Sequence, residues 1–250
     1  MIESHVSVAP PRGQIDVDVP RKQSLLRRIG RHPSLMHYNR LIALVLLVNL
    51  AFLVHGATKG EWWASSGIDL VTISNLALAN LSLAILIRQH HVINLLFRIA
   101  TSAPTSWPLS IRWVLGKVYH FGGLHVGGTL AGTLWHAAFV GSLAFYLANG
   151  LPGVSSGMVV VTSALLAVLL MMGVMALPPI RARHHNSFEL TLRFGGWTAL
   201  LLFWTQTVIF AYDQRGAASL GSVLLSSPSF WMLIVLTTST ILPWLRLRKV

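Results

Sequence analysis

Histidine is the residue type in this chain with the widest chemical scope. The 250 residues include 11 histidines and no cysteine, so thiolate catalysis and cysteine-ligated metals are excluded. An imidazole can bind a metal ion, ligate a haem or transfer a proton near neutral pH. His120, His125 and His136 fall within one long apolar stretch. An ionisable side chain is costly in such a stretch, so it tends to face a cavity, a bundle interior or a cofactor.

The surroundings of His125 allow two interpretations. On a helix, His125 and His136, 11 residues apart, lie within about 20° of one face and about 16 Å apart along the axis. Five glycines around His125 remove side chains from the surface: Gly122, Gly123, Gly127, Gly128 and Gly132. Such a surface admits either a flat macrocycle or a neighbouring helix. The alternative to a ligand role is a neutral imidazole hydrogen-bonded to another helix.

A second group of ionisable residues occurs in the segment RARHHNSFELTLRFGGW, residues 181–197. Glu189 and Arg193 are four residues apart, which predicts an i,i+4 ion pair on a helix. Glu189 is also one turn from His185, so a metal or acid–base site is sterically feasible there. We therefore take Glu189 and Arg193 as candidate catalytic residues. The candidate metal ligands are His120, His125, His184 and His185.

Apolar segments must position these residues. With 54% hydrophobic and 10% charged residues, the chain is typical of a protein embedded in lipid. The sequence predicts an all-α membrane protein, a bundle of six transmembrane helices at residues 40–57, 68–88, 114–148, 157–178, 187–212 and 228–246. The transmembrane domain then spans residues 40–246, between a basic arm at 1–39 and a tail at 247–250.

The distribution of positive charge predicts the orientation. With the N-terminus in the cytoplasm, 17 of the 19 Lys and Arg residues fall on the cytoplasmic side, and Lys59 and Arg215 face outward. Both termini are therefore expected in the cytoplasm, with the chain a multi-pass protein of the inner (cytoplasmic) membrane. The formal charge of +12 is expected to attract anionic lipid headgroups of the bilayer rather than nucleic acid, because no nucleic-acid-reading motif is visible.

Six helices, paired histidines on the third span and the segment 185–197 resemble the ferric-reductase-like transmembrane domain superfamily, whose module is a di-haem cytochrome b. The segment HNSFELTLRFGGW is similar to an H-N-x-F-E-x-T-H-R-F-x-G-W pattern in small integral membrane proteins related to that superfamily. Those proteins often accompany adenylate-forming or secondary-metabolite enzymes. Leu192 stands where this pattern has its internal histidine. Gln206 stands where a second ligand on that span is expected.

The resemblance implies a haem b held between the third and fifth spans, and these departures predict one haem at most. His125 and His185 are the first ligand candidates and His136 the next, and a histidine-bound divalent metal is the alternative cofactor. No flavin or nicotinamide domain is expected in this chain, so electrons would come from a cytoplasmic reductase partner. Under this hypothesis the chain is a membrane oxidoreductase. The alternatives are a haem-less membrane enzyme that acts on a lipid or metabolite through the His/Glu group, and a non-catalytic membrane subunit of a biosynthetic pathway.

Overall fold

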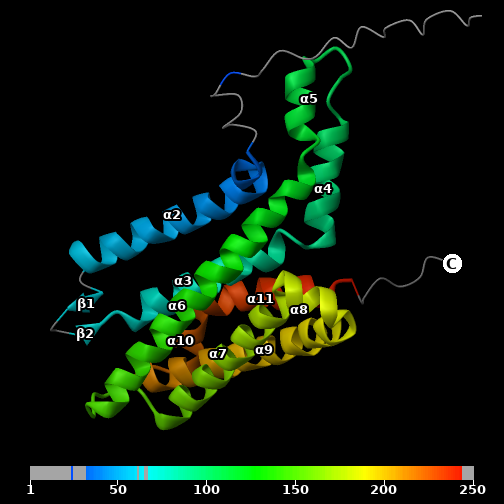
Figure 1. The fold of residues 1–250 in the computed structure, drawn as a ribbon. Helices are drawn as coiled ribbons and strands as arrows, with labels where there is room; N and C mark the ends of the chain where they lie inside the picture. The colour runs from blue at the N-terminus through cyan, green and yellow to red at the C-terminus, as the bar shows by residue number, and fades with distance from the viewer. Residues whose placement is uncertain (1–23, 25–31, 61, 65–66, 244–250) are drawn as a thin grey trace, which may run out of the picture. The chain divides into compact units, whose positions relative to one another are not determined.

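The computed structural model describes residues 24, 32–60, 62–64 and 67–243. The chain divides after Met36 into two units, and the second unit contains the long helices (Figure 1). In the first unit, a short 3₁₀ helix, η1, covers Pro33–Leu35. Most of the predicted basic arm, and the whole of the predicted tail at 247–250, lie outside the described residues.

The second unit is built from helices, with one two-stranded hairpin in the described part of the chain. The first helices are α2 (His37–Thr58), α3 (Leu70–Leu86), α4 (His90–Thr101), α5 (Leu109–Leu115), the 3₁₀ helix η2 (Val118–Phe121) and α6 (Gly122–Ala148). They are followed by α7 (Ser156–Ala176), α8 (Pro178–Arg183), α9 (His185–Gln214), α10 (Leu220–Ser226) and α11 (Pro228–Ile241). The strands β1 (Trp63–Ala64) and β2 (Gly67–Ile68) pair antiparallel before α3.

Local sequence signals explain where several helices begin. The Asp69 side chain accepts a hydrogen bond from the backbone N–H of Thr72 at 2.9 Å and so caps α3. Ser155 caps α7 by accepting from the N–H of Met158. Pro178 and Pro228 stand in the first turns of α8 and α11, where the missing N–H costs nothing.

Several of these helices are long and apolar enough to cross a membrane. Within the described residues, α2, α7, α9 and the segment 118–148 pass this test individually. Two bent pairs pass it together: α3 with α4, at an angle of 60°, and α10 with α11, at 74°. The number of helices that meet the length and hydropathy requirement is thus four, or up to six if each bent pair is one span. The predicted ranges 40–57, 157–178 and 187–212 correspond to α2, α7 and α9.

The continuous span predicted at 114–148 was wrong at its beginning. The helix α5 ends at Leu115, and η2 intervenes before α6 begins at Gly122. The backbone N–H of Gly116 bonds the carbonyl oxygen of Arg112, which closes the last turn of α5. Hydropathy averaged over a window does not detect such a short break, because the residues on both sides are apolar.

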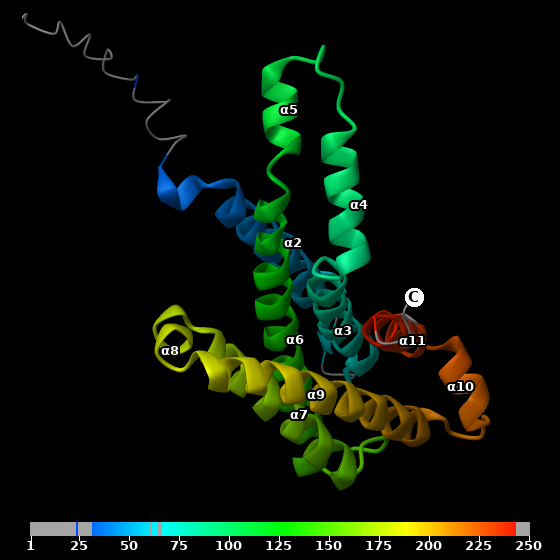
Figure 2. The same ribbon diagram turned by 90° about the vertical axis from the view of Figure 1, so that its right-hand side faces the viewer.

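Helix α6 is the central element, since α2, α3 and α7 all pack on it (Figures 1 and 2). Its glycines face two different neighbouring helices. A methyl group at Gly127 would approach Val45 of α2, and one at Gly128 would lie 2.7 Å from the carbonyl oxygen of Asn80 on α3. The glycine-rich surface around His125 therefore packs against two helices, which is one of the two interpretations left open by the sequence.

A polar contact joins α2, α3 and α6 further along α6 than these glycines. The side-chain amides of Asn49 on α2 and Asn80 on α3 bond each other reciprocally, at 2.9 and 2.7 Å. Trp135 on α6 donates its indole N–H to Oδ1 of Asn49 at 2.8 Å. We call Asn49, Asn80 and Trp135 the amide junction. It satisfies groups that would otherwise be unpaired among apolar side chains.

The helices α4 and α5 form a separate hairpin next to the beginning of α6, and they lie side by side in Figure 2. Helix α4 is strongly amphipathic, with Leu95 and Ile99 exposed on its apolar side. Helix α5 exposes Leu109 and Trp113. Short amphipathic helices with exposed Trp and basic residues are typical of membrane interfaces.

Candidate functional site

His125 lies near the beginning of α6 and faces α3. Its Nδ1 atom is 2.8 Å from the carbonyl oxygen of Ala84, and a carbonyl oxygen can only accept, so Nδ1 carries the proton. In the neutral ring, Nε2 is then the atom with the available lone pair. This arrangement satisfies the imidazole by helix packing, and it is also the bond that metal-ligating histidines usually make with their second nitrogen.

His136 is completely buried and faces α7 instead. Its Nε2 lies 3.0 Å from the carbonyl oxygen of Thr162, and its Nδ1 has no hydrogen-bond partner. The rings of Phe139 and Phe203 pack around it at centroid distances of 6.2 and 5.8 Å. Although His125 and His136 share one side of an ideal helix, they contact different helices, α3 and α7.

The segment at the beginning of α9 brings His185 and Glu189 together. The Nε2 atom of His185 lies 3.1 Å from Oε1 of Glu189, and each side chain is 66% exposed. The predicted ion pair between Glu189 and Arg193 was wrong, because the carboxylate turns back by one helical turn to the histidine. His184 precedes the helix and its side chain is exposed.

The ligand sets proposed from the sequence can be compared with this geometry. Among the described residues, no three His, Cys, Asp or Glu side chains lie close enough together to hold a metal ion. His120, His125, His184 and His185 are therefore not assembled as one metal site. Each of the candidates His125, His136 and His185 contacts a different neighbour.

Helix α9 has no histidine at the two positions where the related pattern predicts haem ligands. A bis-histidine haem needs an imidazole on each face, and α9 contributes Leu192 and Gln206 at the positions where the related pattern predicts ligands. Gln206 is 4% exposed and its Oε1 has no hydrogen-bond partner. For a single haem, His125 can offer Nε2, but His185 is largely exposed and occupied by Glu189.

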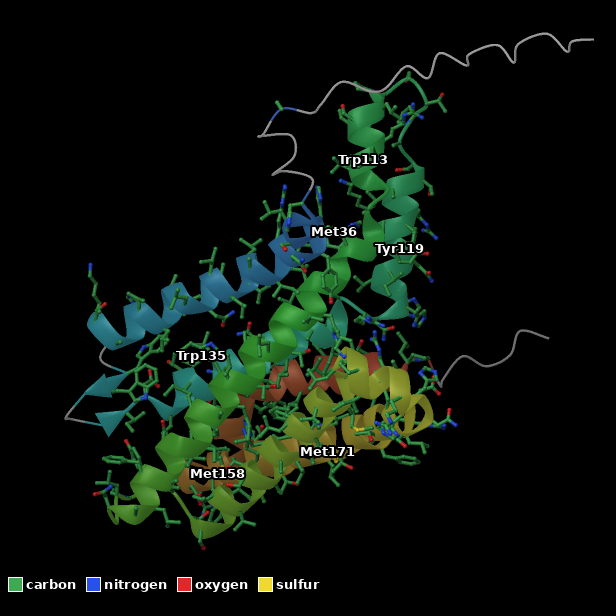
Figure 3. The ribbon with its side chains drawn as sticks, viewed as in Figure 1. Met36, Trp113, Tyr119, Trp135, Met158 and Met171 are labelled. Carbon is green, nitrogen blue, oxygen red and sulfur yellow. The ribbon has the colours of Figure 1, made fainter. Side chains whose placement is uncertain are left out.

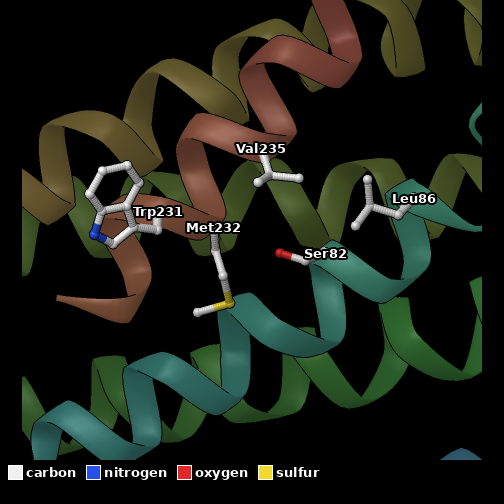
Figure 4. A pocket seen from close by; sticks show the side chains of 5 residues that line it. All are labelled: Ser82, Leu86, Trp231, Met232 and Val235. Carbon is white, nitrogen blue, oxygen red and sulfur yellow. The ribbon is translucent and has the colours of Figure 1, made fainter.

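A shallow pocket of about 230 Å³ lies between α3 and α11 (Figure 4). It is lined by Ser82, Leu86, Trp231, Met232 and Val235. Its volume is below the range of about 300–1,000 Å³ that is typical of small-molecule sites. The lining is mostly apolar and includes no titratable group.

A group of residues that includes the candidate His120, and whose assembly the sequence did not predict, lies where α2 meets the segment before α6. We call His37, Arg40, Trp113, Lys117 and His120 the basic cluster. The Nζ atom of Lys117 lies 3.3 and 3.4 Å from Nε2 and Nδ1 of His37, and 3.1 Å from the centre of the Trp113 ring. The rings of His37 and His120 are 5.8 Å apart. The sequence signal was present, since Trp113 and Lys117 are one turn apart on a helix, but their contact with residues about 80 positions earlier is tertiary.

Figure 3 shows Trp113 and Tyr119 on the segment that leads into α6, with Trp135 further along that helix. Trp113 is 63% exposed and Tyr119 is 82% exposed. Aromatic side chains with one polar end concentrate at membrane–water interfaces. The basic cluster therefore lies at the level where a membrane surface is expected.

These features define the class of the protein as far as the geometry allows. It is a helical protein with several helices that could cross a membrane and whose inner faces pack closely against one another. No family model and no solved structure matches the chain.

Two curated proteins from Coprinopsis cinerea are similar to this chain. Adenylate-forming reductase 03009 is 40% identical over 240 residues, and adenylate-forming reductase 06235 is 36% identical over 241 residues. Each match covers 95% of this chain and 23% of the relative. The chain thus spans about a quarter of the length of the relatives it matches.

Proposed function

We propose that this chain is a six-span membrane module that holds an adenylate-forming reductase at the membrane surface, either as part of the same polypeptide or as a separate subunit. In this proposal α3 makes one span, α10 with α11 makes one bent span, α4 lies at the membrane surface, and both ends of the chain face the cytoplasm. The observation that carries the proposal is the pattern of similarity: nearly all of this chain matches a minor part of a larger enzyme.

The geometry supports an anchoring role over a catalytic one. The glycines of α6 bring helices together, and the intramembrane histidines His125 and His136 each bond a backbone carbonyl oxygen of a neighbouring helix. Large apolar side chains cover the outside of the candidate spans, for example Leu47 on α2 and Leu201 on α9. Such surfaces are expected to face lipid.

A domain exchange tests this proposal. Deleting the matched 240 residues from adenylate-forming reductase 03009 should move the enzyme from the membrane fraction to the soluble fraction of cells that express it. Inserting this chain at the deletion should return the enzyme to the membrane fraction. Sedimentation after alkaline carbonate washing, with immunoblotting, is the measurement. If the enzyme that lacks these residues still sediments with membranes, the anchoring proposal is wrong.

The second candidate is a redox role with one histidine-held haem or metal near the cytoplasmic surface, supplied with electrons by a separate reductase. It is supported by the bond from Nδ1 of His125 to Ala84, which directs Nε2 away from the carbonyl as in a ligand. The reductase name of the relatives agrees with redox chemistry but does not mention a haem. Under this hypothesis His185, with Glu189, would complete the site.

Absorption spectroscopy separates the second candidate from the first. The redox proposal expects a Soret band and sharp reduced α and β bands in the purified chain, and their loss in His125→Ala. His55→Ala is the matched control, because this histidine lies in α2 at the opposite end of the bundle. A colourless preparation that also contains no stoichiometric metal rejects the redox proposal.

A further inference from the structure

The basic cluster concentrates positively charged groups where α2 meets the segment before α6. Lys117 and Arg40 are permanent cations at neutral pH in ordinary surroundings, and two imidazoles lie beside them. Lys117 stands just before the candidate span that begins at Val118. Partial loss of solvent, and secondly repulsion by Arg40, lower the pKa of Lys117 below its usual value.

The carboxylates that the structure describes are all engaged elsewhere. Asp69 caps α3, Glu189 contacts His185, and Asp213 accepts hydrogen bonds from the N–H and Oγ of Ser155 at 2.9 and 2.7 Å. None of these three residues therefore serves as the counter-ion of Lys117. In the described part of the chain, its ammonium contacts the neutral ring face of Trp113 and the nitrogens of His37.

The cluster also contains an unused polar atom. Nδ1 of His120 is buried and has no hydrogen-bond partner in the described part of the chain. An ammonium group and an imidazole that can donate are the groups with which proteins bind phosphate. Basic pockets between the ends of membrane helices, next to exposed Trp and Tyr, bind lipid headgroups in this way.

We propose that the basic cluster is a binding site for a phosphate group, presented by an anionic phospholipid at the end of α2 and α6. Lys117 supplies the central positive charge, Arg40 adds the long-range attraction, and His120 donates a hydrogen bond from Nδ1. Trp113 lies under the Lys117 ammonium and limits its movement. The exposed rings of Trp113 and Tyr119 place this site at the depth of lipid headgroups rather than in bulk water.

The test measures binding of phosphate compounds to the purified full-length chain in detergent micelles. The probes are short-chain phosphatidic acid, short-chain phosphatidylcholine and inorganic phosphate, each titrated while the melting temperature is followed. The chain should bind phosphatidic acid in preference to phosphatidylcholine, and this preference should weaken as salt is added. If inorganic phosphate competes with phosphatidic acid, free phosphate is also a ligand of the site. If it does not compete, the ligand is the lipid.

Variants locate the site. Lys117→Gln should weaken binding of phosphatidic acid about five-fold, as expected for loss of one positive charge at a membrane surface. Lys117→Arg should retain binding. Lys59→Gln makes the same charge change at the other end of α2 and should leave binding unchanged.

Two results would overturn the proposal. One is that the wild-type chain shows no preference for phosphatidic acid over phosphatidylcholine, a measurement that does not depend on the folding of any variant. The other is an equal loss of binding in Lys117→Gln and Lys59→Gln, which would mean that only the overall charge of the chain attracts the lipid.

Discussion

Replacement of Gly128 by alanine is expected to destabilise the helix bundle by about 2 kcal/mol, within the usual cost of overpacking a close contact. The added methyl group would lie 2.7 Å from the backbone carbonyl oxygen of Asn80 and 3.3 Å from Cβ of Ala84. A backbone oxygen cannot rotate away, so α3 and α6 must separate. This outweighs the gain in helix propensity of about 1 kcal/mol from Gly to Ala.

Titration with SDS in mixed micelles measures the free energy of unfolding of Gly128→Ala. Gly141→Ala is the matched control, since it lies on the same helix and its methyl group would meet nothing within 4 Å. That variant should be as stable as the wild-type chain or slightly more stable. If Gly128→Ala and Gly141→Ala are equally stable, the close contact between α3 and α6 is not formed in solution.

The position of most apolar helices could be predicted, because a run of apolar residues long enough to cross a bilayer leaves few other solutions. The predictions for α2, α7 and α9 came within a few residues of their ends. The break between α5 and α6 could not be predicted, since the backbone leaves the α-helical conformation only at Lys117, within an otherwise apolar pattern.

The partners of the ionisable residues were harder to predict than the helices. Glu189 has a histidine four residues before it and an arginine four residues after it, and the energies of two such exposed pairs differ by a few tenths of a kcal/mol at most. His125 and His136 share one side of a helix, yet their contacts with Ala84 and Thr162 depend on how α3 and α7 cross α6. The spacing of residues in the sequence places them on one helix but does not say how neighbouring helices cross that helix.

The basic cluster could not be predicted either, because it also depends on tertiary contacts. Apart from His120, a candidate metal ligand, its residues are unremarkable in the sequence, where positive charge near a span indicates only orientation. The structure joins His37 to Lys117 across 80 positions. Charge that was interpreted as a diffuse cytoplasmic signal thus includes one compact group with its own geometry.

Replacement of Asn49 by alanine is expected to cost about 2 kcal/mol of unfolding free energy, because it removes all three interhelical hydrogen bonds of the amide junction. Interhelical hydrogen bonds in membrane proteins contribute about 0.6 kcal/mol each on average, with a maximum near 1.7. The substitution leaves the indole N–H of Trp135 without its acceptor among apolar side chains, which raises the cost above that of an exposed bond.

Asn149→Ala is the matched control, since that amide is exposed and bonds only the carbonyl oxygen of Phe145 on its own helix. Its effect should stay within about 0.5 kcal/mol. The double variant Asn49→Ala, Asn80→Ala should then lose less than the sum of the two single losses, because either substitution already breaks the reciprocal pair. Strict additivity in the same SDS titration would show that the two amides do not bond each other and that Asn49 is held by Trp135 alone among the polar contacts of the junction.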